Sequence, residues 1–396
     1  MKTYDFIFAG GGLAGLSLAC QMARSPLRHR SMLIVDQVSS PRDDRTFSFW
    51  SNLPGPFDRA VSSSWKQLAF HAPGFSHTAS LGSYRYKTIR GIDFFRQARQ
   101  ELGACSNIEF RRGRITHLQD RPSGAVLTVD GQQIAGKWAF DSRFRPADLV
   151  PDTHRYHYLK MSFRGWEIES TRAVFDPQAA ILMDFRTPQN SDVRFFYCLP
   201  IDDRRALVEY TLFTNQRVKP ETCLAALNGY LNTAFKLEPE KDCQISSREA
   251  GSLLVTDQPF PRQSGGHVLA IGLPGGCLKP TTGYAFTRIQ RDSHAIVQSL
   301  LEKGHPFQLP AAPPPYPLLD AIMLEVMACH PGKIPGIFTA LFKKNPFERI
   351  LRFLDEDASL GEIRQLMASL PPAIFLQILA RRSASPRAFL RTLISA

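Results

Sequence analysis

The feature that most constrains the fold is a glycine-rich turn near the N-terminus. Residues 10–15 read GGGLAG, which fits the pattern G-x-G-x-x-G. The apolar run at residues 4–9 predicts a buried strand before this turn, and the apolar spacing of residues 13–24 predicts a helix after it. A second apolar run, residues 31–35, ends at Asp36, roughly 20 residues after Gly15. This order of elements is typical of a βαβ unit that binds a dinucleotide.

Each residue type in this unit has a predicted task. Gly10 permits the tight turn, Gly12 lets the backbone approach a pyrophosphate, and Gly15 completes the motif. The phosphates are expected on the unpaired N–H groups at the helix N-terminus. Asp36 is expected to accept hydrogen bonds from ribose hydroxyls. The alternative is a glycine turn in an unrelated βαβ unit, and the motif does not choose between NAD and FAD.

A second glycine-rich segment near residue 280 favours FAD over NAD. Residues 267–272 predict a buried strand, and residues 285–301 predict a helix. The loop between them carries Gly275, Gly276, Thr282 and Gly283, and it leads into a helix N-terminus that suits an anion or a dipole. In flavoproteins such a late strand, loop and helix return to the first βαβ unit and point at the isoalloxazine. The FAD domain is therefore expected to be discontinuous.

Two further positions are candidates for cofactor binding. Arg45 lies in the basic, aromatic segment 42–50 (RDDRTFSFW), for which a solvated loop and an edge strand are the alternative. Asp141 follows the buried run 137–140, and residues at the C-terminal edge of an open α/β sheet lie where ligands bind. Residues 108–110, 115–118 and 125–129 predict a strand meander that ends at an Asp-Gly turn.

Residues 154–214 predict a mostly antiparallel sheet that roofs an apolar substrate cavity. Within this region Glu209 interrupts an otherwise apolar and aromatic strand, residues 206–213 (ALVEYTLF). Desolvation there raises the pKa of a carboxyl group, and a carboxylic acid that stays protonated near neutral pH can act as a general acid. The alternative, a residue on the solvent face paired with an arginine, has equal weight, because an alternation of period two does not say which face is buried.

The net charge of +12 favours an anionic partner such as nucleic acid, anionic lipid or an anionic cofactor. No nucleic-acid-binding motif accompanies it, so nucleic acid is discounted. The seven cysteines form no C-x-x-C pair, and we expect neither a zinc site nor a disulfide framework, hence no metal and a reducing, cytoplasmic compartment. We expect no signal peptide, and no apolar run approaches the roughly 18–20 residues of a membrane span.

The last ninety residues predict helices after a break at Pro313–Pro315. Residues 371–396 contain four arginines, at positions 381, 382, 387 and 391, and no acidic residue. Flanking apolar residues make this a basic amphipathic end that suits an anionic bilayer surface. The alternative is a helix pair that closes the substrate cavity with solvated arginines.

Several segments in order along the chain resemble the bacterial lycopene β-cyclase family, which shares its fold with p-hydroxybenzoate hydroxylase-like flavoproteins. Besides the glycine turn, they are residues 43–50 (DDRTFSFW), 163–166 (FRGW), 182–186 (LMDFR), 207–213 (LVEYTLF), 280–284 (PTTGY) and 352–356 (RFLDE). Family members often have an acidic residue where Tyr210 stands and a proline where Leu254 stands. These departures concern the exact substrate more than the fold.

The resemblance implies a ring closure without net redox change. The ψ end of lycopene is protonated, the cation closes on the neighbouring double bonds, and a ring proton is lost. The family uses reduced FAD with NADPH as reductant, and its essential acid falls on Glu209. A lycopene substrate in turn implies work at the inner surface of the cell membrane. The alternative function is an FAD-dependent monooxygenase or reductase acting on an apolar terpenoid or aromatic substrate.

The predicted fold class is therefore α/β, with a discontinuous Rossmann-like FAD-binding domain, an inserted β-sheet substrate domain and a C-terminal helical segment. The FAD-binding domain is assigned residues 1–70, 90–150 and 262–305. The substrate domain is assigned residues 71–89 and 151–261, and the helical segment residues 306–396. The oligomeric state, the β or ε outcome and the number of lycopene ends cyclised are left open.

Overall fold

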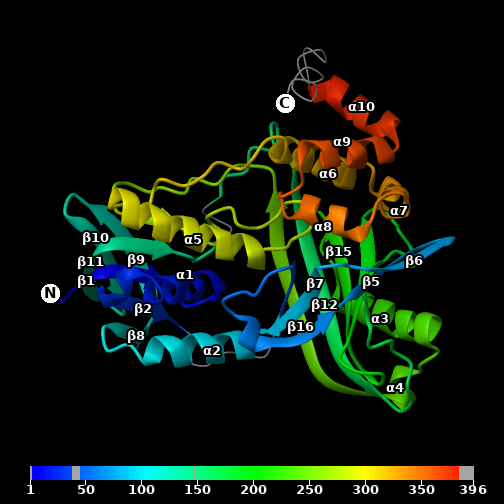
Figure 1. Ribbon diagram of the computed structural model, residues 1–396, viewed down its shortest axis with the longest axis horizontal. Helices are drawn as coiled ribbons and strands as arrows, with labels where there is room; N and C mark the ends of the chain where they lie inside the picture. Colours follow the sequence, from blue (N-terminus) through cyan, green and yellow to red (C-terminus); the bar gives the residue numbers. More distant parts are fainter. Residues whose placement is uncertain (1, 38–44, 146–148, 383–396) are drawn as a thin grey trace.

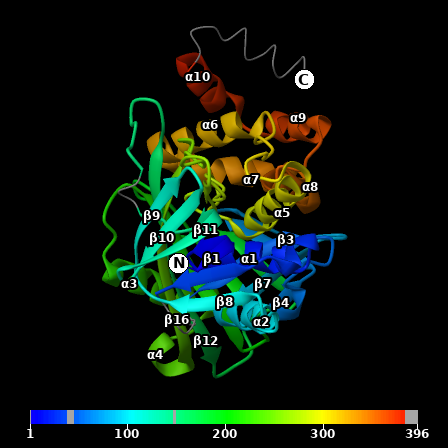
Figure 2. The same ribbon diagram turned by 90° about the vertical axis from the view of Figure 1, so that its left-hand side faces the viewer.

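The computed structural model of the protein describes residues 2–37, 45–145 and 149–382, with side chains as far as residue 380 (Figure 1). Within these residues the chain forms three sheets, helices on one face of the first sheet, and a group of C-terminal helices over the second sheet (Figures 1 and 2).

The first sheet contains the N-terminal βαβ unit. Its main order is β8-β2-β1-β11-β10-β9, and the short strand β17 also pairs with β11. Strands β8, β2, β1, β11 and β17 are parallel, whereas β9 and β10 are antiparallel. The strands are β1 (Thr3–Ala9), β2 (Met32–Asp36), β8 (Ile108–Arg112), β9 (Ile115–Arg121), β10 (Gly124–Val129), β11 (Gln132–Asp141) and β17 (Val268–Ala270).

Three helices pack on one face of this sheet. They are α1 (Leu13–Ala23), α2 (Gly91–Gly103) and α5 (Phe286–Lys303), and α1 contacts both of the others. Alternate strand residues such as Phe6, Phe8 and Ile34 share one apolar cluster with these helices. The intervening residues, such as Ile7, Leu33 and Val35, belong to a second cluster on the opposite face. Both faces of the parallel strands are therefore buried, as their continuous apolar runs predict.

The predicted meander of residues 108–129 is wrong for its first strand. Strand β8 lies at the far edge of the sheet and pairs parallel with β2, from Met32 opposite Ile108 to Asp36 opposite Arg112. The reason is the connection before it, because a strand that follows a crossover helix such as α2 joins its sheet in parallel. Only β9, β10 and β11 form an antiparallel meander.

The second sheet has the order β16-β12-β15-β14-β13-β5-β6 and is antiparallel except between β13 and β5. Its outer face is covered by α3 (Pro220–Phe235), which is followed by the short α4 (Pro239–Asp242). The strands are β5 (Gln67–Ala72), β6 (Phe75–Ser80), β12 (Tyr158–Ser170), β13 (Ala179–Asp184), β14 (Val193–Pro200), β15 (Arg205–Thr214) and β16 (Cys243–Thr256).

A small third sheet and the C-terminal helices complete the molecule. The third sheet has the order β3 (Thr46–Ser51), β7 (Arg85–Arg90) and β4 (Val61–Trp65). The helices are α6 (Tyr316–Cys329), α7 (Ile334–Lys344), α8 (Phe347–Leu354), α9 (Leu360–Ser369) and α10 (Pro372–Arg382), and the 3₁₀ turns are η1 (Pro26–His29), η2 (Asp58–Ala60) and η4 (Pro331–Lys333). Residues of these helices share one apolar cluster with the second sheet, for example Phe342 stacked on Phe70 at 4.4 Å between ring centroids.

No single helix within the described residues is long and apolar enough to cross a membrane. The bent pair Leu360–Ser369 and Pro372–Ala380, at 107°, reaches the required length and composition only when taken together. Of the predicted basic end, positions 387 and 391 lie outside the described residues, and the side chains at 381 and 382 are not described.

The predicted fold class is confirmed by the arrangement of the sheets. The late strand β17 does return to the N-terminal sheet, where Val268 pairs with Ala139. The second sheet is inserted between the parts of the first, and helices follow it. The exact domain boundaries stay a prediction, because strand pairing says only which strands share a sheet.

Candidate active site

One large cavity lies between the N-terminal βαβ unit and the second sheet. Its volume is about 740 Å³. One end is lined by the start of α1, and the other by residues of β12, β14, β15 and β16. The loop before α5 lines the stretch between them, so elements far apart in the sequence share one wall.

The glycine turn forms the first end of the cavity. A Cβ atom at Gly10, whose φ is +113°, would collide with the hydroxyl of Ser142, and one at Gly15 would collide with the carbonyl oxygen of Gly10. These two glycines keep the turn and the helix close to the sheet. Gly12 differs, because a Cβ atom there would meet no described atom within 4 Å and would point into open space. The surface at Gly12 is therefore free for a ligand.

The N-terminus of α1 faces the same space. Leu13 and Ala14 line the cavity, and within the described residues no side chain caps the helix and its first turn has no acidic residue. Unpaired N–H groups and the helix dipole make such an end attractive to an anion. Asp36 also lines the cavity, and its Oδ2 accepts a hydrogen bond from the Gly11 N–H at 2.7 Å. This carboxylate is thus fixed beside the turn.

The structure divides the predicted cofactor-binding residues into two groups. Gly12, Asp36, Arg45, Thr282 and Gly283 line the cavity, together with the predicted acid at position 209. Gly10, Gly15, Asp141, Gly275 and Gly276 are not part of that lining.

The residues outside the lining belong to closely packed turns. The carboxylate of Asp141 binds the guanidinium of its neighbour Arg143 at 2.7 Å. A Cβ atom at Gly275 would lie 2.8 Å from the carbonyl oxygen of Ala270, so the loop packs closely against the strand there. Gly276 has a φ of +75° in the same turn. Direct contact of these residues with a cofactor stays a prediction.

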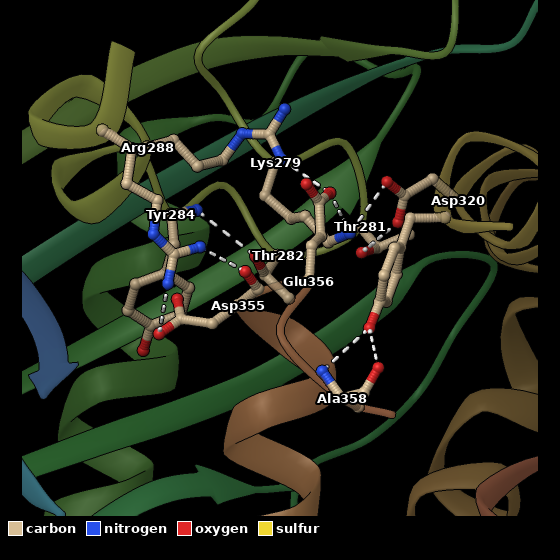
Figure 3. A network of polar contacts seen from close by, with 11 residues as sticks. Lys279, Thr281, Thr282, Tyr284, Arg288, Asp320, Asp355, Glu356 and Ala358 are labelled. Atoms are coloured by element: carbon tan, nitrogen blue, oxygen red, sulfur yellow. Dashed lines mark hydrogen bonds and ion pairs between the residues drawn. The ribbon is translucent and has the colours of Figure 1, made fainter. Parts of the chain in front are cut away.

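The loop before α5 is anchored by a buried network of charges. The ammonium group of Lys279, 3% exposed, binds Asp320 of α6 at 2.9 Å and Glu356 at 2.8 Å. Arg288 of α5 binds Glu356 at 2.6 Å, and the hydroxyl of Thr281 donates to Asp320 at 3.1 Å (Figure 3). The network therefore fixes the loop to the C-terminal helices, while the next residues of the loop line the cavity.

Lys279 and Arg288 lower the pKa values of the carboxyl groups that they contact in this network, against the effect of burial. Burial alone raises the pKa of Glu356, but Lys279 and Arg288 outweigh it and hold that pKa below its ordinary value. At Asp320 burial is the stronger effect, and the pKa is raised despite Lys279. Two causes explain the difference. Glu356 contacts two cations whereas Asp320 contacts one, and the charge of Glu356 raises the pKa of Asp320 further.

Three tyrosines lie where the loop approaches the second sheet; Tyr86 is buried, and Tyr197 and Tyr284 are partly buried. Tyr86 and Tyr284 are hydrogen-bonded through their hydroxyls at 2.8 Å, and Tyr197 hydrogen-bonds to Tyr284. Burial raises the pKa of Tyr86 to about 12 and also raises that of the other two phenols, so all three are neutral at pH 7. With Phe163 and Phe286 they make this part of the cavity largely aromatic.

Glu209 lies in this aromatic part, on the cavity face of β15. Leu207, Glu209 and Thr211 line the cavity, whereas Val208 and Tyr210 face the apolar cluster under α3. The alternation of residues along the strand did not show whether Glu209 faces solvent or the interior, and in the structure it faces the cavity. The Oε1 of Glu209 accepts a hydrogen bond from the hydroxyl of Thr211 at 2.8 Å.

A second carboxyl group, that of Glu249, lies beside Glu209 in the same cavity. Glu249 belongs to β16, is 8% exposed, and accepts a hydrogen bond from the Thr46 hydroxyl at 3.0 Å. Burial raises the pKa of Glu209 well above its ordinary value, and the charge of Glu249 and a hydrogen bond with it raise it further, while Thr211 lowers it. At neutral pH the pair therefore holds a proton on Glu209 in an apolar setting, which is what a general acid needs.

Sequence reasoning missed the partners that complete this site. Thr211 could have been predicted, since it stands two positions after Glu209 and so shares its face of the strand. Thr46, Tyr86 and Tyr197 carry no local signal, because strand pairing across long stretches of chain brings them to the cavity. Among the described residues, no group of three or more His, Cys, Asp and Glu side chains could hold a metal ion.

Solved structures place this architecture in the class of flavoprotein folds. A geranylgeranyl bacteriochlorophyll reductase-like protein from Thermoplasma acidophilum is 12% identical, with a TM-score of 0.62 over 96% of this chain and 99% of that chain. HpxO of Klebsiella pneumoniae, solved with FAD and uric acid, is 14% identical, with a TM-score of 0.65 over 93% of this chain and 97% of that chain. At these identities the likeness establishes the fold alone.

Within that class the chain belongs to the lycopene cyclase protein family, whose profile matches residues 5–380. A lycopene beta-cyclase from Paracoccus sp. (strain N81106 / MBIC 01143) is 27% identical over 303 residues, which are 72% of this chain and 70% of that protein. Neoxanthin synthase, a chloroplastic protein of Solanum lycopersicum, is 21% identical over 76% of this chain and 61% of that protein. The resemblance stated from the sequence is thus confirmed.

Proposed function

We propose that the protein is an FAD-dependent lycopene β-cyclase that converts linear lycopene, by way of γ-carotene, to β-carotene. The observation that carries this proposal is that two carboxyl groups, those of Glu209 and Glu249, both pair across Gly165 and line an aromatic part of the cavity that also reaches the glycine turn. Protonation of an unactivated alkene requires a neutral acid away from water, and this pair supplies one. Membership in the lycopene cyclase family supports the same substrate class.

The lining of the cavity fits FAD. Gly12 leaves open space beside the N-terminus of α1, where unpaired N–H groups suit a pyrophosphate, and Asp36 is held where a ribose would lie. Thr282 and Gly283 lie farther along the cavity, toward the carboxyl pair, and suit the flavin ring. When bound in its reduced, anionic form, the flavin would supply negative charge that stabilises a carbocation in the cavity. NADPH is the proposed reductant.

The residues of the chain have separate tasks in the proposed reaction. Glu209 donates its proton to C2 of the ψ end, and the resulting cation at C1 is attacked by the C5–C6 double bond. Tyr86, Tyr197 and Phe163 exclude water, which would otherwise trap the cation as an alcohol. Their ring faces carry partial negative charge and stabilise a nearby cation. Loss of the proton from C6 then closes the β ring without net oxidation or reduction.

The place of action proposed is the cytoplasmic face of the cell membrane, with peripheral attachment. A C40 hydrocarbon partitions into the bilayer, so the enzyme must meet its substrate there. Helix α10 supports this proposal, because its Leu376 is 56% exposed and lies in the segment that leads to the basic end.

The function is tested by supplying lycopene in phospholipid vesicles to the protein with FAD and either NADPH or dithionite without oxygen, and in parallel with FAD and NADPH in air. We expect β-carotene, with the same mass as lycopene, and far less than one NADPH consumed per ring formed. A product that has gained oxygen or hydrogen, with one NADPH consumed for each turnover, would instead establish the monooxygenase or reductase alternative.

The cofactor assignment is tested by Gly12→Val. The new side chain enters open space in the protein alone, so it blocks only a bound ligand. We expect the purified variant to keep its circular dichroism spectrum and to lose nearly all bound flavin. Gly229→Val in α3, where a Cβ atom also meets no described atom within 4 Å, is the matched control and should keep its flavin. Full flavin content in Gly12→Val would contradict the assignment.

A further inference from the structure

Ring closure requires two proton transfers, and the structure offers two carboxyl groups for them. One proton is added at C2 and a different one is lost from C6, so the enzyme needs an acid and a base within reach of one end of the substrate. The two transfers cancel, and the catalyst returns to its starting state once the proton taken up by the base reaches the acid. This inference rests on the proposed cyclase function.

The register of the second sheet brings the two carboxyl groups together across a glycine. Strand β12 lies between β15 and β16, and its residue Gly165 pairs with Glu209 on one side and with Glu249 on the other. A Cβ atom at Gly165 would lie 3.0 Å from the Cγ of Glu249, 3.3 Å from its Oε1 and 3.1 Å from the Cδ1 of Leu207. Glycine at this position leaves space for the side chain of Glu249 over the middle strand, on the face of the sheet that also carries Glu209.

The two glutamates are held by different hydroxyl groups. Thr211, on the same strand as Glu209, donates to that residue at 2.8 Å. Thr46 of β3, in a different sheet, donates to Glu249 at 3.0 Å. A hydroxyl donor stabilises the charged form of the carboxyl group that it contacts, so each threonine favours a carboxylate at its own partner. Burial and the negative charge of Glu249 both keep the proton on Glu209. The pair is therefore asymmetric, with an acid on β15 and a carboxylate on β16.

We propose that Glu249 is the base that removes the C6 proton and that it returns this proton directly to Glu209 across the gap left by Gly165. In the first step the O–H bond of Glu209 breaks, a C–H bond forms at C2, and C1 becomes cationic. The C1–C6 bond then forms and moves the charge to C5. Glu249 takes the proton from C6, and the C–H electron pair becomes the C5–C6 double bond. The proton then passes from Glu249 to Glu209, and both residues regain their original states.

This assignment also makes Glu249 a determinant of the product. Loss of a proton from C6 gives a β ring, whereas loss from C4 gives an ε ring. A base fixed by Thr46 at one point of the cavity selects one of these protons. The choice of ring, which the sequence left open, is thereby assigned to the position of one carboxylate.

The test uses lycopene deuterated at C6 and C6′ with the flavin-loaded enzyme in vesicles. In the wild type we expect deuterium at C2 of the product, because the label removed from one ring is returned to the acid for the next closure. Glu249→Gln should lose this transfer, turn over about 10²–10⁴-fold more slowly and release products other than the β ring. Glu249→Asp, which withdraws the base by one carbon, should turn over faster than Glu249→Gln and show a larger deuterium isotope effect than the wild type.

Two controls separate this inference from a structural role and from the proposed function. Thr46→Val removes the hydroxyl donor and Thr46→Ser keeps it, so the first should change the ratio of β to ε rings and the second should not. Flavin content and circular dichroism report whether each variant is folded. Unchanged label transfer and ring type in folded Glu249→Gln would overturn the assignment of Glu249. Failure of the wild type to cyclise lycopene would instead overturn the proposed function itself.

Discussion

The protein buries two groups of ionisable side chains on either side of one loop, and they are built on opposite principles. In the network around Lys279, two cations face two carboxylates, and each charge has a partner of opposite sign within 3.0 Å (Figure 3). In the cavity, Glu209 and Glu249 face each other and accept hydrogen bonds from threonine hydroxyls. In the first arrangement cations oppose the effect of burial on the pKa of the carboxyl groups, and in the second a neighbouring carboxyl group adds to that effect.

The difference shows how a fold separates stability from reactivity. A buried charge that is paired on all sides contributes to the position of the elements that carry it, here the loop, α5, α6 and the segment after α8. A buried acid beside another carboxylate raises the free energy of its ionised form, which makes its proton available for transfer. The loop that the first group anchors supplies Thr282 and Tyr284 to the cavity that holds the second.

The largest effect is expected for Glu209→Gln, which keeps the shape of the side chain and removes its transferable proton. General acid catalysis is worth about 10²–10⁴-fold, so cyclisation of lycopene should fall by at least that range. Thermal stability at pH 7 should stay the same or rise, because Glu209 must take up a proton when the chain folds and glutamine need not. The measurement is lycopene conversion by flavin-loaded protein under dithionite. Near wild-type conversion would show that Glu209 is only structural, and the acid role would then pass to Glu249.

In the network around Lys279, removal of a charged group should lower the stability of the protein. Lys279→Met leaves Asp320 facing Glu356 without the ammonium group between them, and removal of one partner from a buried ion pair typically costs about 3–5 kcal/mol. The measurement is the free energy of unfolding in urea. The matched control is Lys241→Met, whose ion pair with Glu238 is largely exposed and should contribute at most about 1 kcal/mol. Equal effects of the two substitutions would mean that the buried network does not anchor the loop.

The sequence predicts the glycine turn and its surroundings far better than it predicts the two groups of ionisable side chains. The turn at Gly10–Gly15 and Asp36 form one local unit, in which strand, helix and strand follow one another, so their spacing determines their geometry. The late strand β17 was also predicted, because its apolar run ends in a glycine-rich loop. Strand β8 was misplaced because its partner, β2, lies far from it in the sequence.

The carboxyl pair shows the same limit in the active site. The sequence predicts Glu209 as a candidate acid because it is a lone charge in an apolar strand. Whether its side chain faces the cavity or the opposite side of the sheet depends on what packs against β15. Its meeting with Glu249 depends on two strand registers that share Gly165, and a shift of one residue in either would turn one carboxylate away. The Lys279 network joins the loop before α5, the helices α5 and α6, and the segment after α8. Register and helix docking are set by the whole core rather than by local sequence.

The smallest expected effect concerns Asp355, which precedes Glu356 of the Lys279 network in the chain. Burial raises the pKa of Asp355 to about 7, although Arg291 lies 3.7 Å away and lowers it. The unfolded chain releases this proton near pH 4, whereas the folded protein holds it until about pH 7. Unfolding therefore releases a proton between these values, and the contribution of Asp355 to stability falls as the pH rises through this window.

Asp355→Asn removes this dependence and so shows whether a carboxyl group beside the paired network behaves like the acid in the cavity. The stability of the variant relative to the wild type should increase by about 1 kcal/mol for each pH unit between pH 5 and 7 and level off above pH 8. Arg352 holds the pKa of Glu362 below its ordinary value, so the stabilisation from Glu362 is lost only at lower pH. Glu362→Gln should therefore differ from the wild type by a constant amount over the same range. If the Asp355→Asn and wild-type curves, measured by urea unfolding, run parallel from pH 5 to 8, Asp355 is ionised in the folded protein and belongs with the charges paired around Lys279.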